Sequence, residues 1–268
     1  MEKISERELN SKFRIVDTHA HLDGVKDIEG AIRRAVETGI YAIVAVSSDS
    51  ESCREILRIA ERYSGESIKI YPALGIHPWS LLKDDLESAL KFIEERIDQA
   101  IAVGEVGLDY WLKEAKKNPE FKDMQKKALQ KFLEIAERHD KAVLIHSRGA
   151  WRDSYEIVKE SNVERVIFHW FSGPEDVLFD VLDSGYYISA TPAAQYSKAH
   201  REAIGKAPLS RIVLETDSPV RYMGEEAEPS HILKALKAVA EIKRVEEDDV
   251  AEQTTRNAVQ ILKIEKPT

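Results

Sequence analysis

The stretch FRIVD (residues 13–17) is a short, largely apolar run of the kind that forms a buried β-strand, and it is the first of eight such runs. The others are YAIVAV (41–46), IKIYPAL (68–74), AIAVGEV (100–106), AVLIHS (142–147), RVIFHW (165–170), YYISA (186–190) and RIVLET (211–216). Nearly continuous apolar strands separated by helical segments are typical of a parallel sheet covered by helices. An open, doubly wound sheet is the rival arrangement, but eight strands favour a closed α/β fold, the (β/α)8 TIM barrel.

The segments between these runs predict amphipathic helices. Residues 51–65 end at Gly65, a residue type that often caps a helix C-terminus. Residues 122–140 carry an apolar stripe at helical spacing. After the eighth run, residues 230–242 and 246–262 predict two more helices that complete the ring.

Length and composition bound the class of protein. A chain of 268 residues with 43% hydrophobic and 32% charged residues suits a soluble globular protein with a single barrel domain. We assign residues 1–12 to an N-terminal extension and residues 13–268 to the barrel. The net charge of −9 argues against a broad basic face that grips duplex nucleic acid.

Features that would place the chain outside the cytoplasm are missing from the sequence. The single cysteine, Cys53, cannot form an internal disulfide, which suits a reducing compartment. No apolar run is long enough to span a membrane, and the first residues, MEKISERELNSKF, lack the apolar core of a signal peptide. We therefore expect a cytoplasmic protein without membrane contact, and no obligate protein partner is evident.

Residue types that bind metal ions stand repeatedly at the ends of the predicted strands. Barrel enzymes place their catalytic residues there, because the following loops form the mouth of the active site. The positions are His19 and His21 after the first run, His77 after the third, Glu105 at the end of the fourth, His146 at the end of the fifth, His169 at the end of the sixth and Asp217 after the eighth. So many placements on one rim are improbable in a structural core, and we predict a metal centre.

His19 and His21 form an H-x-H pair, in which both imidazoles can face one ion because residues two apart at a strand end point to the same side. Alone, such a pair can also be two polar loop residues. Glu105 follows an apolar strand and needs a cation or several donors if it is buried. It could bridge two ions through its two oxygens, or form a structural salt bridge with an arginine.

His146 and His169 lie on neighbouring predicted strands and could converge on a second ion, since imidazole suits Zn, Mn or Fe. Taken singly, either could be a core histidine. Asp217, in LETDSP, could both ligate an ion and accept a proton from an activated water. Its alternative role is that of a turn residue before Pro219.

Two further residues are candidates for substrate contact. His77, in GIHPW, lies outside the six-ligand set and is either a substrate contact or outer-shell group, or a structural loop residue. Arg148 could point its guanidinium at a phosphate or carboxylate, although a structural ion pair fits equally well. Three tryptophans could wall the pocket or serve packing: Trp79, Trp111 and Trp170. We expect His200 on the surface.

Several motifs together resemble the TatD family of metal-dependent deoxyribonucleases, within the amidohydrolase superfamily. They are DTHAHLD (17–23), GIHPW (75–79), GEVGLDY (104–110), IHSR (145–148), HWFSG (169–173) and LETDSP (214–219), and TTRNA (254–258) resembles the family's C-terminal helix. The motifs occur in family order over nearly the whole chain. Jointly they are highly specific.

The resemblance implies a hydrolase with two divalent ions, of Zn, Mn or Mg. His19, His21 and Asp217 would hold one ion and His146 and His169 the other, with Glu105 between them. Water activated by the two ions would attack a phosphodiester phosphorus, with Asp217 as the general base. The implied substrate is an end of single-stranded DNA or RNA, or a small phosphodiester or ester. Many superfamily relatives have a carboxylated lysine at the position of Glu105, and its absence favours TatD.

One segment departs from the family pattern. Residues 221–231, RYMGEEAEPSH, are acidic where relatives often carry a more basic stretch. Acidic side chains near the mouth would repel a polyanion, so a two-metal hydrolase of small-molecule esters, lactones or cyclic amides is the alternative. A non-catalytic binding protein on a barrel scaffold is a third possibility, which six filled ligand positions disfavour.

Overall fold

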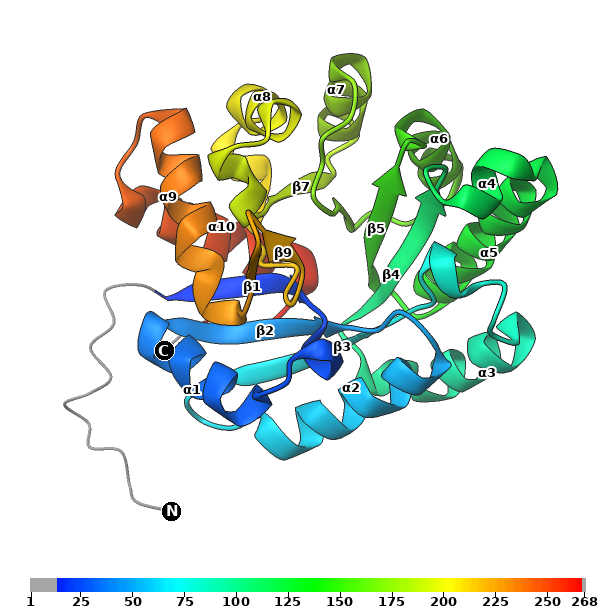
Figure 1. Ribbon diagram of the computed structural model, residues 1–268, viewed down its shortest axis with the longest axis horizontal. Coiled ribbons are helices and arrows are strands. Elements are labelled where there is room, and N and C mark those ends of the chain that lie inside the picture. The colour runs from blue at the N-terminus through cyan, green and yellow to red at the C-terminus, as the bar shows by residue number, and fades with distance from the viewer. Residues whose placement is uncertain (1–13, 267–268) are drawn as a thin grey trace.

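A nearly closed ring of eight parallel strands forms the centre of the molecule (Figure 1). The computed structural model describes residues 14–266, so the predicted N-terminal extension lies outside the described residues. The strands pair in chain order and are β1 (Ile15–Ala20), β2 (Ile40–Val46), β3 (Lys69–Leu74), β4 (Ala102–Asp109), β5 (Ala142–Arg148), β6 (Val166–Phe168), β7 (Tyr187–Ala190) and β8 (Ile212–Leu214). A parallel bridge between Ala20 and Ser218 joins the end of β1 to the segment that follows β8. The predicted (β/α)8 barrel is confirmed.

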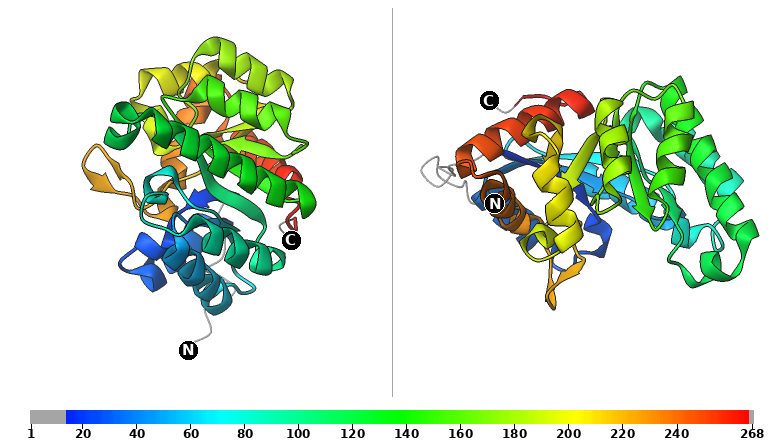
Figure 2. Two further views of the ribbon diagram at one scale, coloured as in Figure 1. Left: turned by 90° about the vertical axis from the view of Figure 1, so that its right-hand side faces the viewer. Right: turned by 90° about the horizontal axis from the view of Figure 1, so that it is seen from above.

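Helices surround the strands on the outside, as the two further views show (Figure 2). They are α1 (Ile28–Thr38), α2 (Ser50–Tyr63), α3 (Leu86–Arg96), α4 (Lys113–Lys117), α5 (Pro119–Arg138), α6 (Trp151–Glu160), α7 (Glu175–Asp183), α8 (Lys198–Lys206), α9 (Ile232–Lys243) and α10 (Glu247–Leu262). A hairpin of β9 (Arg221–Tyr222) and β10 (Glu225–Glu226) follows β8. None of the described helices combines the length and apolarity needed to cross a membrane.

Several element boundaries differ from the sequence predictions, among them those of β1, β4 and α2. β1 continues to Ala20, so His19 lies within the strand. β4 continues to Asp109, because its ladder with β5 runs on to the pair Asp109–Arg148 beyond the apolar run. α2 ends at Tyr63 with the extended residue Ser64 as its C-cap, so Gly65 follows at the predicted C′ position but without a left-handed backbone.

The barrel interior and its N-terminal end are filled by apolar side chains. Alternate strand residues point inward, and those of Val44 and Leu144 join one cluster with Ile261 of α10. Asn257 of α10 also donates from Nδ2 to the carbonyl of Ile212 at 2.7 Å, where β8 begins. Helix α10 therefore covers the end of the barrel opposite the rim that carries the predicted ligands.

Candidate metal centre

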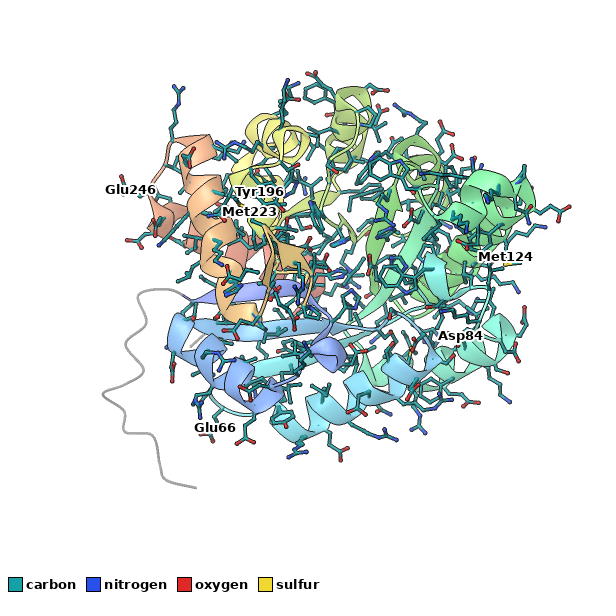
Figure 3. All side chains as sticks on the ribbon, viewed as in Figure 1. Glu66, Asp84, Met124, Tyr196, Met223 and Glu246 are labelled. Carbon is teal, nitrogen blue, oxygen red and sulfur yellow. The ribbon has the colours of Figure 1, made fainter. Side chains whose placement is uncertain are left out.

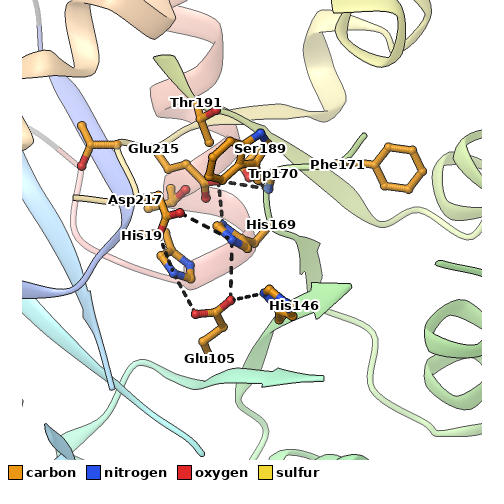
Figure 4. Close-up of polar contacts among 12 residues, drawn as sticks. His19, Glu105, His146, His169, Trp170, Phe171, Ser189, Thr191, Glu215 and Asp217 are labelled. Carbon is orange, nitrogen blue, oxygen red and sulfur yellow. Dashed lines mark hydrogen bonds and ion pairs between the residues drawn. The ribbon is translucent and has the colours of Figure 1, made fainter. Parts of the chain in front are cut away.

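The six residues predicted as metal ligands converge at the C-terminal rim of the barrel, and five of them are labelled in Figure 4. They are His19 in β1, His21 directly after it, Glu105 in β4, His146 in β5, His169 after β6 and Asp217 after β8. None of their side chains is more than 14% exposed. Segments far apart in sequence thus place four histidines and two carboxylates around one buried point.

Glu105 lies at the middle of this cluster. Its Oε2 is 3.3 Å from Nε2 of both His19 and His21. Its Oε1 is 2.7 Å from Nδ1 of His146 and 3.5 Å from Nε2 of His169. Each carboxylate oxygen therefore faces a different pair of imidazoles.

The spacing on the Oε2 side fits the ligands of a single ion. The Nε2 atoms of His19 and His21 are 3.4 Å apart, and Asp217 Oδ1 is 3.6 Å from each. Two ligand atoms at 2.0–2.1 Å from one tetrahedral ion lie about 3.4 Å apart. The three side chains form one of the groups whose ligand atoms all lie within 4.8 Å of one another.

The charges of the cluster also call for cations. Burial would raise the pKa of Glu105, but His77, His19 and His169 hold it well below its usual range. Burial lowers the pKa of His169, but Glu215, Asp217 and Glu105 outweigh this and raise it to about 10. Several buried carboxylates around one point are stable only with compensating positive charge, which divalent ions supply.

Two carboxylates that were not predicted from the sequence contact His169 and His146 on the ring nitrogen opposite the one that faces Glu105. Glu215 Oε1 accepts from Nδ1 of His169 at 2.8 Å, which leaves Nε2 facing the cluster. Asp109 Oδ2 lies 3.3 Å from Nε2 of His146, which leaves Nδ1 facing Glu105. Such partners fix the ring orientation of metal-binding histidines and make them stronger ligands.

A sequence signal for both carboxylates exists. Asp109 follows Glu105 by four residues and Glu215 precedes Asp217 by two, and residues at such even spacings in a strand point to the same face as each other. Asp109 was overlooked because β4 was expected to end at residue 106.

The backbone of Asp217 is held in an unusual conformation. Its φ is 50°, a left-handed value that costs a residue with a side chain roughly 1–2 kcal/mol. Its N–H donates to the carbonyl of His19 at 2.9 Å. The preceding Thr216 donates through both N–H (2.9 Å) and Oγ1 (2.6 Å) to Asp17, whose pKa burial raises to about 8. These contacts between β1 and the end of β8 fix the direction of the Asp217 carboxylate.

His77 is completely buried beside the cluster rather than exposed at its mouth. Its Nδ1 accepts from the N–H of Trp79 at 3.2 Å, so the hydrogen of the neutral ring is on Nε2. That Nε2 has no hydrogen-bond partner and lies 3.6 Å from Glu105 Oε1. Burial and the neighbouring His146 lower the pKa of His77 well below its usual value. His77 thus presents an N–H to the site.

Arg148 takes part in the ion pair that was one of its two expected roles. Its Nη2 lies 2.6 Å from Asp109 Oδ2, and its Nε donates to the same oxygen at 2.9 Å. The side chain remains 46% exposed. The guanidinium is therefore fixed at the edge of the site with part of its surface open.

The acidic segment after β8 was expected to repel a polyanion, but its carboxylates form ion pairs with nearby cations. Glu225 lies 2.6 Å from Lys234, Glu226 lies 3.3 Å from Arg221 and 3.4 Å from Lys26, and Glu228 lies 2.7 Å from Arg34. Neighbouring cations thus compensate much of the negative charge that was expected to repel a polyanion.

The prediction that His200 lies on the surface is wrong. The ring is completely buried, donates from Nδ1 to the carbonyl of Phe171 at 2.7 Å and accepts at Nε2 from the N–H of Thr191 at 3.1 Å. Burial lowers its pKa to about 4. His200 therefore joins α8 to the loops after β6 and β7.

Comparisons with known proteins identify the family of this chain. The TatD related DNase family matches residues 16–263. The human protein named Deoxyribonuclease TATDN3 is 32% identical over 263 residues, which cover 92% of this chain and 94% of that protein. The uncharacterized metal-dependent hydrolase YabD of Bacillus subtilis is 31% identical over 93% of this chain and 99% of its own length.

A solved structure matches closely as well. The crystal structure of YJJV, a TatD homologue from Escherichia coli, has a TM-score of 0.85 and 28% sequence identity. The match covers 94% of this chain and 99% of that chain.

Proposed function

Since the chain belongs to the family of TatD-related DNases and is a hydrolase, we propose that it cleaves phosphodiester bonds at an end of single-stranded DNA or RNA with the help of two divalent ions. The observation that carries the proposal is the position of Glu105, whose two oxygens face two separate pairs of histidines. A carboxylate so placed suits a centre with two ions.

Under this proposal each ion has its own set of ligands. His19, His21 and Asp217 would hold the first and His146 and His169 the second, with Glu105 shared. Zn, Mn or Mg ions bound there would polarise a phosphoryl oxygen and generate a nucleophile from water near neutral pH. Glu215 and Asp109 would keep the imidazole nitrogens directed at the ions.

Asp217 is the proposed proton acceptor. Its Oδ1 lies near His19 and His21, while Oδ2 is 4.0 Å from His169 Nε2 and less engaged. Burial raises the pKa of this carboxyl, although the neighbouring histidines oppose the shift. A carboxylate with a raised pKa is a better base near neutral pH.

His77 and Arg148 would position the substrate. The unpartnered N–H of His77 at Nε2 can donate to a phosphoryl oxygen beside Glu105. The Arg148 guanidinium, anchored on Asp109, can contact a phosphate through its open edge.

A substrate panel with metal analysis tests the proposal. Purified protein would be assayed on single-stranded oligonucleotides, duplexes, lactones and esters with Mn²⁺, Mg²⁺ or Zn²⁺, and its metal content measured by elemental analysis. We expect up to two ions per chain and cleavage of the single strands. Intact oligonucleotides together with efficient ester or lactone hydrolysis would replace this function with the small-molecule alternative. No metal binding and no activation by metal would refute the two-ion centre.

A further inference from the structure

Exposed apolar side chains gather around the mouth of the barrel. Eight large hydrophobic residues are exposed among residues 14–266, and five of them lie in loops that follow strands on the metal-centre side: Trp79, Leu82, Trp111, Tyr196 and Met223. In Figure 3, Tyr196 and Met223 lie by the β9–β10 hairpin. Apolar surface concentrated around a polar site indicates a ligand-binding surface.

Trp79 is connected to the metal centre through one ring. Its indole stacks on the imidazole of His77, with 3.4 Å between ring centroids and 31° between planes. The ring centroid of His77 in turn lies 4.2 Å from that of His146. Trp79 is 47% exposed, so the indole is fixed by His77 while much of its surface is open.

Trp111 lies in the loop after β4 and is 61% exposed. Its backbone N–H donates at 2.9 Å to Oδ1 of Asp109, the carboxylate that also holds Arg148. Its ring lies against Gly149, where an added Cβ would come within 2.4 Å of the indole. Gly149 also has a φ of +69°, so both the close indole and the left-handed backbone require glycine at this position. The glycine therefore leaves room for the Trp111 indole against the backbone next to Arg148.

The chain around Trp111 is locally basic in a protein of net charge −9. Residues 113–127 contain six lysines and three acidic residues. Lys113, Lys116 and Lys117 of the short helix α4 are exposed, and Lys122 lies over the ring of Tyr110 at 4.6 Å. Open aromatic faces beside cations are the two components of a surface for single-stranded nucleic acid.

We propose that Trp79 and Trp111 are stacking surfaces for unpaired bases of the strand whose phosphate lies at Arg148 and the metal centre. The inference rests on the proposed function and adds how the protein would recognise a single strand. Every base has a π face, so stacking gives affinity without sequence preference. Bases within a duplex are already stacked on their neighbours and cannot reach the indoles, so the same surface selects unpaired ends.

The test compares Trp79→Ala, Trp111→Ala, their Phe counterparts and Phe179→Ala. Phe179 is a matched control, since it is 44% exposed but lies on the outer helix α7. Each is assayed on a single-stranded oligonucleotide and on a strand of the same length built from abasic nucleotides. We expect each Ala variant to weaken binding of the normal strand by about 5- to 100-fold. The Phe variants should recover most of the loss, and neither the abasic strand nor Phe179→Ala should show any effect.

A second measurement is independent of cleavage. Oligonucleotides containing 2-aminopurine lose fluorescence when this base stacks, and the emission is read with the wild type and both Ala variants. We expect quenching by the wild type that each Ala variant reduces. If the wild type cleaves single strands but the Trp variants act like Phe179→Ala, the stacking inference fails while the function stands. If the wild type cleaves no oligonucleotide, the proposed function fails. If the wild type also does not quench the 2-aminopurine fluorescence, the stacking inference fails as a separate result. Equal losses on normal and abasic strands would also overturn it, because they indicate damage to the centre itself.

Discussion

At the scale of single residues, Asp217 and His77 are suited to different tasks in the proposed mechanism. Asp217 is a buried carboxylate whose pKa burial raises, with one oxygen directed at His19 and His21. His77 is a neutral ring whose Nδ1 is already occupied by a backbone N–H. The first can accept a proton, whereas the second can only donate at Nε2.

Asp217→Asn should retain part of its metal but lose activity. The amide oxygen can still ligate an ion, but it is too weak a base to take the proton of the attacking water. General-base contributions are typically 10²–10⁴-fold, so kcat should fall by about that factor. Turnover and elemental analysis at saturating metal check this, and undiminished turnover would assign the base to another residue.

His77→Asn should keep metal content unchanged while lowering kcat by about 10²–10³-fold, the usual effect of removing one donor to a developing charge. The asparagine oxygen can replace Nδ1 as acceptor for the N–H of Trp79, so the local turn is preserved. The hydrogen at Nε2 is lost. A fall in metal content would instead identify His77 as a ligand, as its grouping with Glu105 and His146 also permits.

At the scale of elements, β4 and the segment after β8 each carry a predicted ligand and a second carboxylate that contacts a predicted histidine ligand from another strand. Glu105 and Asp109 both lie on β4 and hold His146 of β5 between them. This requires β4 to pass close to β5, where a Cβ at Gly107 would come within 1.9 Å of the carbonyl of His146. Gly107, the second glycine of GEVGLDY, is therefore required for the close packing of β4 against β5.

Helix α8 joins the loops after β6 and β7 through His200, and this contact should make stability depend on pH. The pKa of His200 is lowered to about 4 by burial, whereas an unfolded histidine titrates near 6.5. As pH falls below 6.5 the unfolded chain binds the proton first, so stability present above pH 6.5 is lost toward pH 4. The slope from this group is at most about 1.4 kcal/mol per pH unit.

His200→Gln, compared with the wild type by denaturant unfolding at saturating metal, checks this pH dependence. The variant should lose less free energy of unfolding between pH 6.5 and pH 4.5, whatever its stability at pH 7. Parallel curves for the two proteins would show that His200 does not control the dependence.

At the scale of the whole molecule, the charges of the described residues are arranged so that an acidic protein can hold a short polyanion. The carboxylates of the β9–β10 segment are paired with Lys234, Arg221, Lys26 and Arg34. The lysines of residues 113–127 lie in sequence next to Trp111. The mouth is thus less negative than the net charge of −9 suggests.

Binding of a single-stranded oligonucleotide should therefore depend only mildly on salt. If two to four phosphates are neutralised, the slope of log K against log salt is about −1.4 to −2.8. Fluorescence anisotropy between 50 and 200 mM salt would measure it, with Asp217→Asn used to prevent cleavage. A slope steeper than about −4 would indicate a long basic groove, which the described residues do not provide.

The sequence by itself determined the barrel and brought the six predicted ligands to one rim. This was possible because parallel strands in a barrel present their C-terminal ends on the same side, so an apolar run followed by His, Glu or Asp specifies both the fold and the place of the side chain. The strand count and the order of the motifs were sufficient for the family as well.

Only the tertiary structure decided which carboxylates orient the ligands and which charges cancel. Glu215 reaches His169 over 46 residues of sequence, and Lys26 reaches Glu226 over 200. Such pairs depend on the relative register of strands and on where loops return, which local periodicity does not encode. Burial of His77 and His200 has the same origin, because a loop or helix residue becomes buried only when another segment packs over it. The local pattern specifies the donors, and the packing of distant segments specifies their partners and charge.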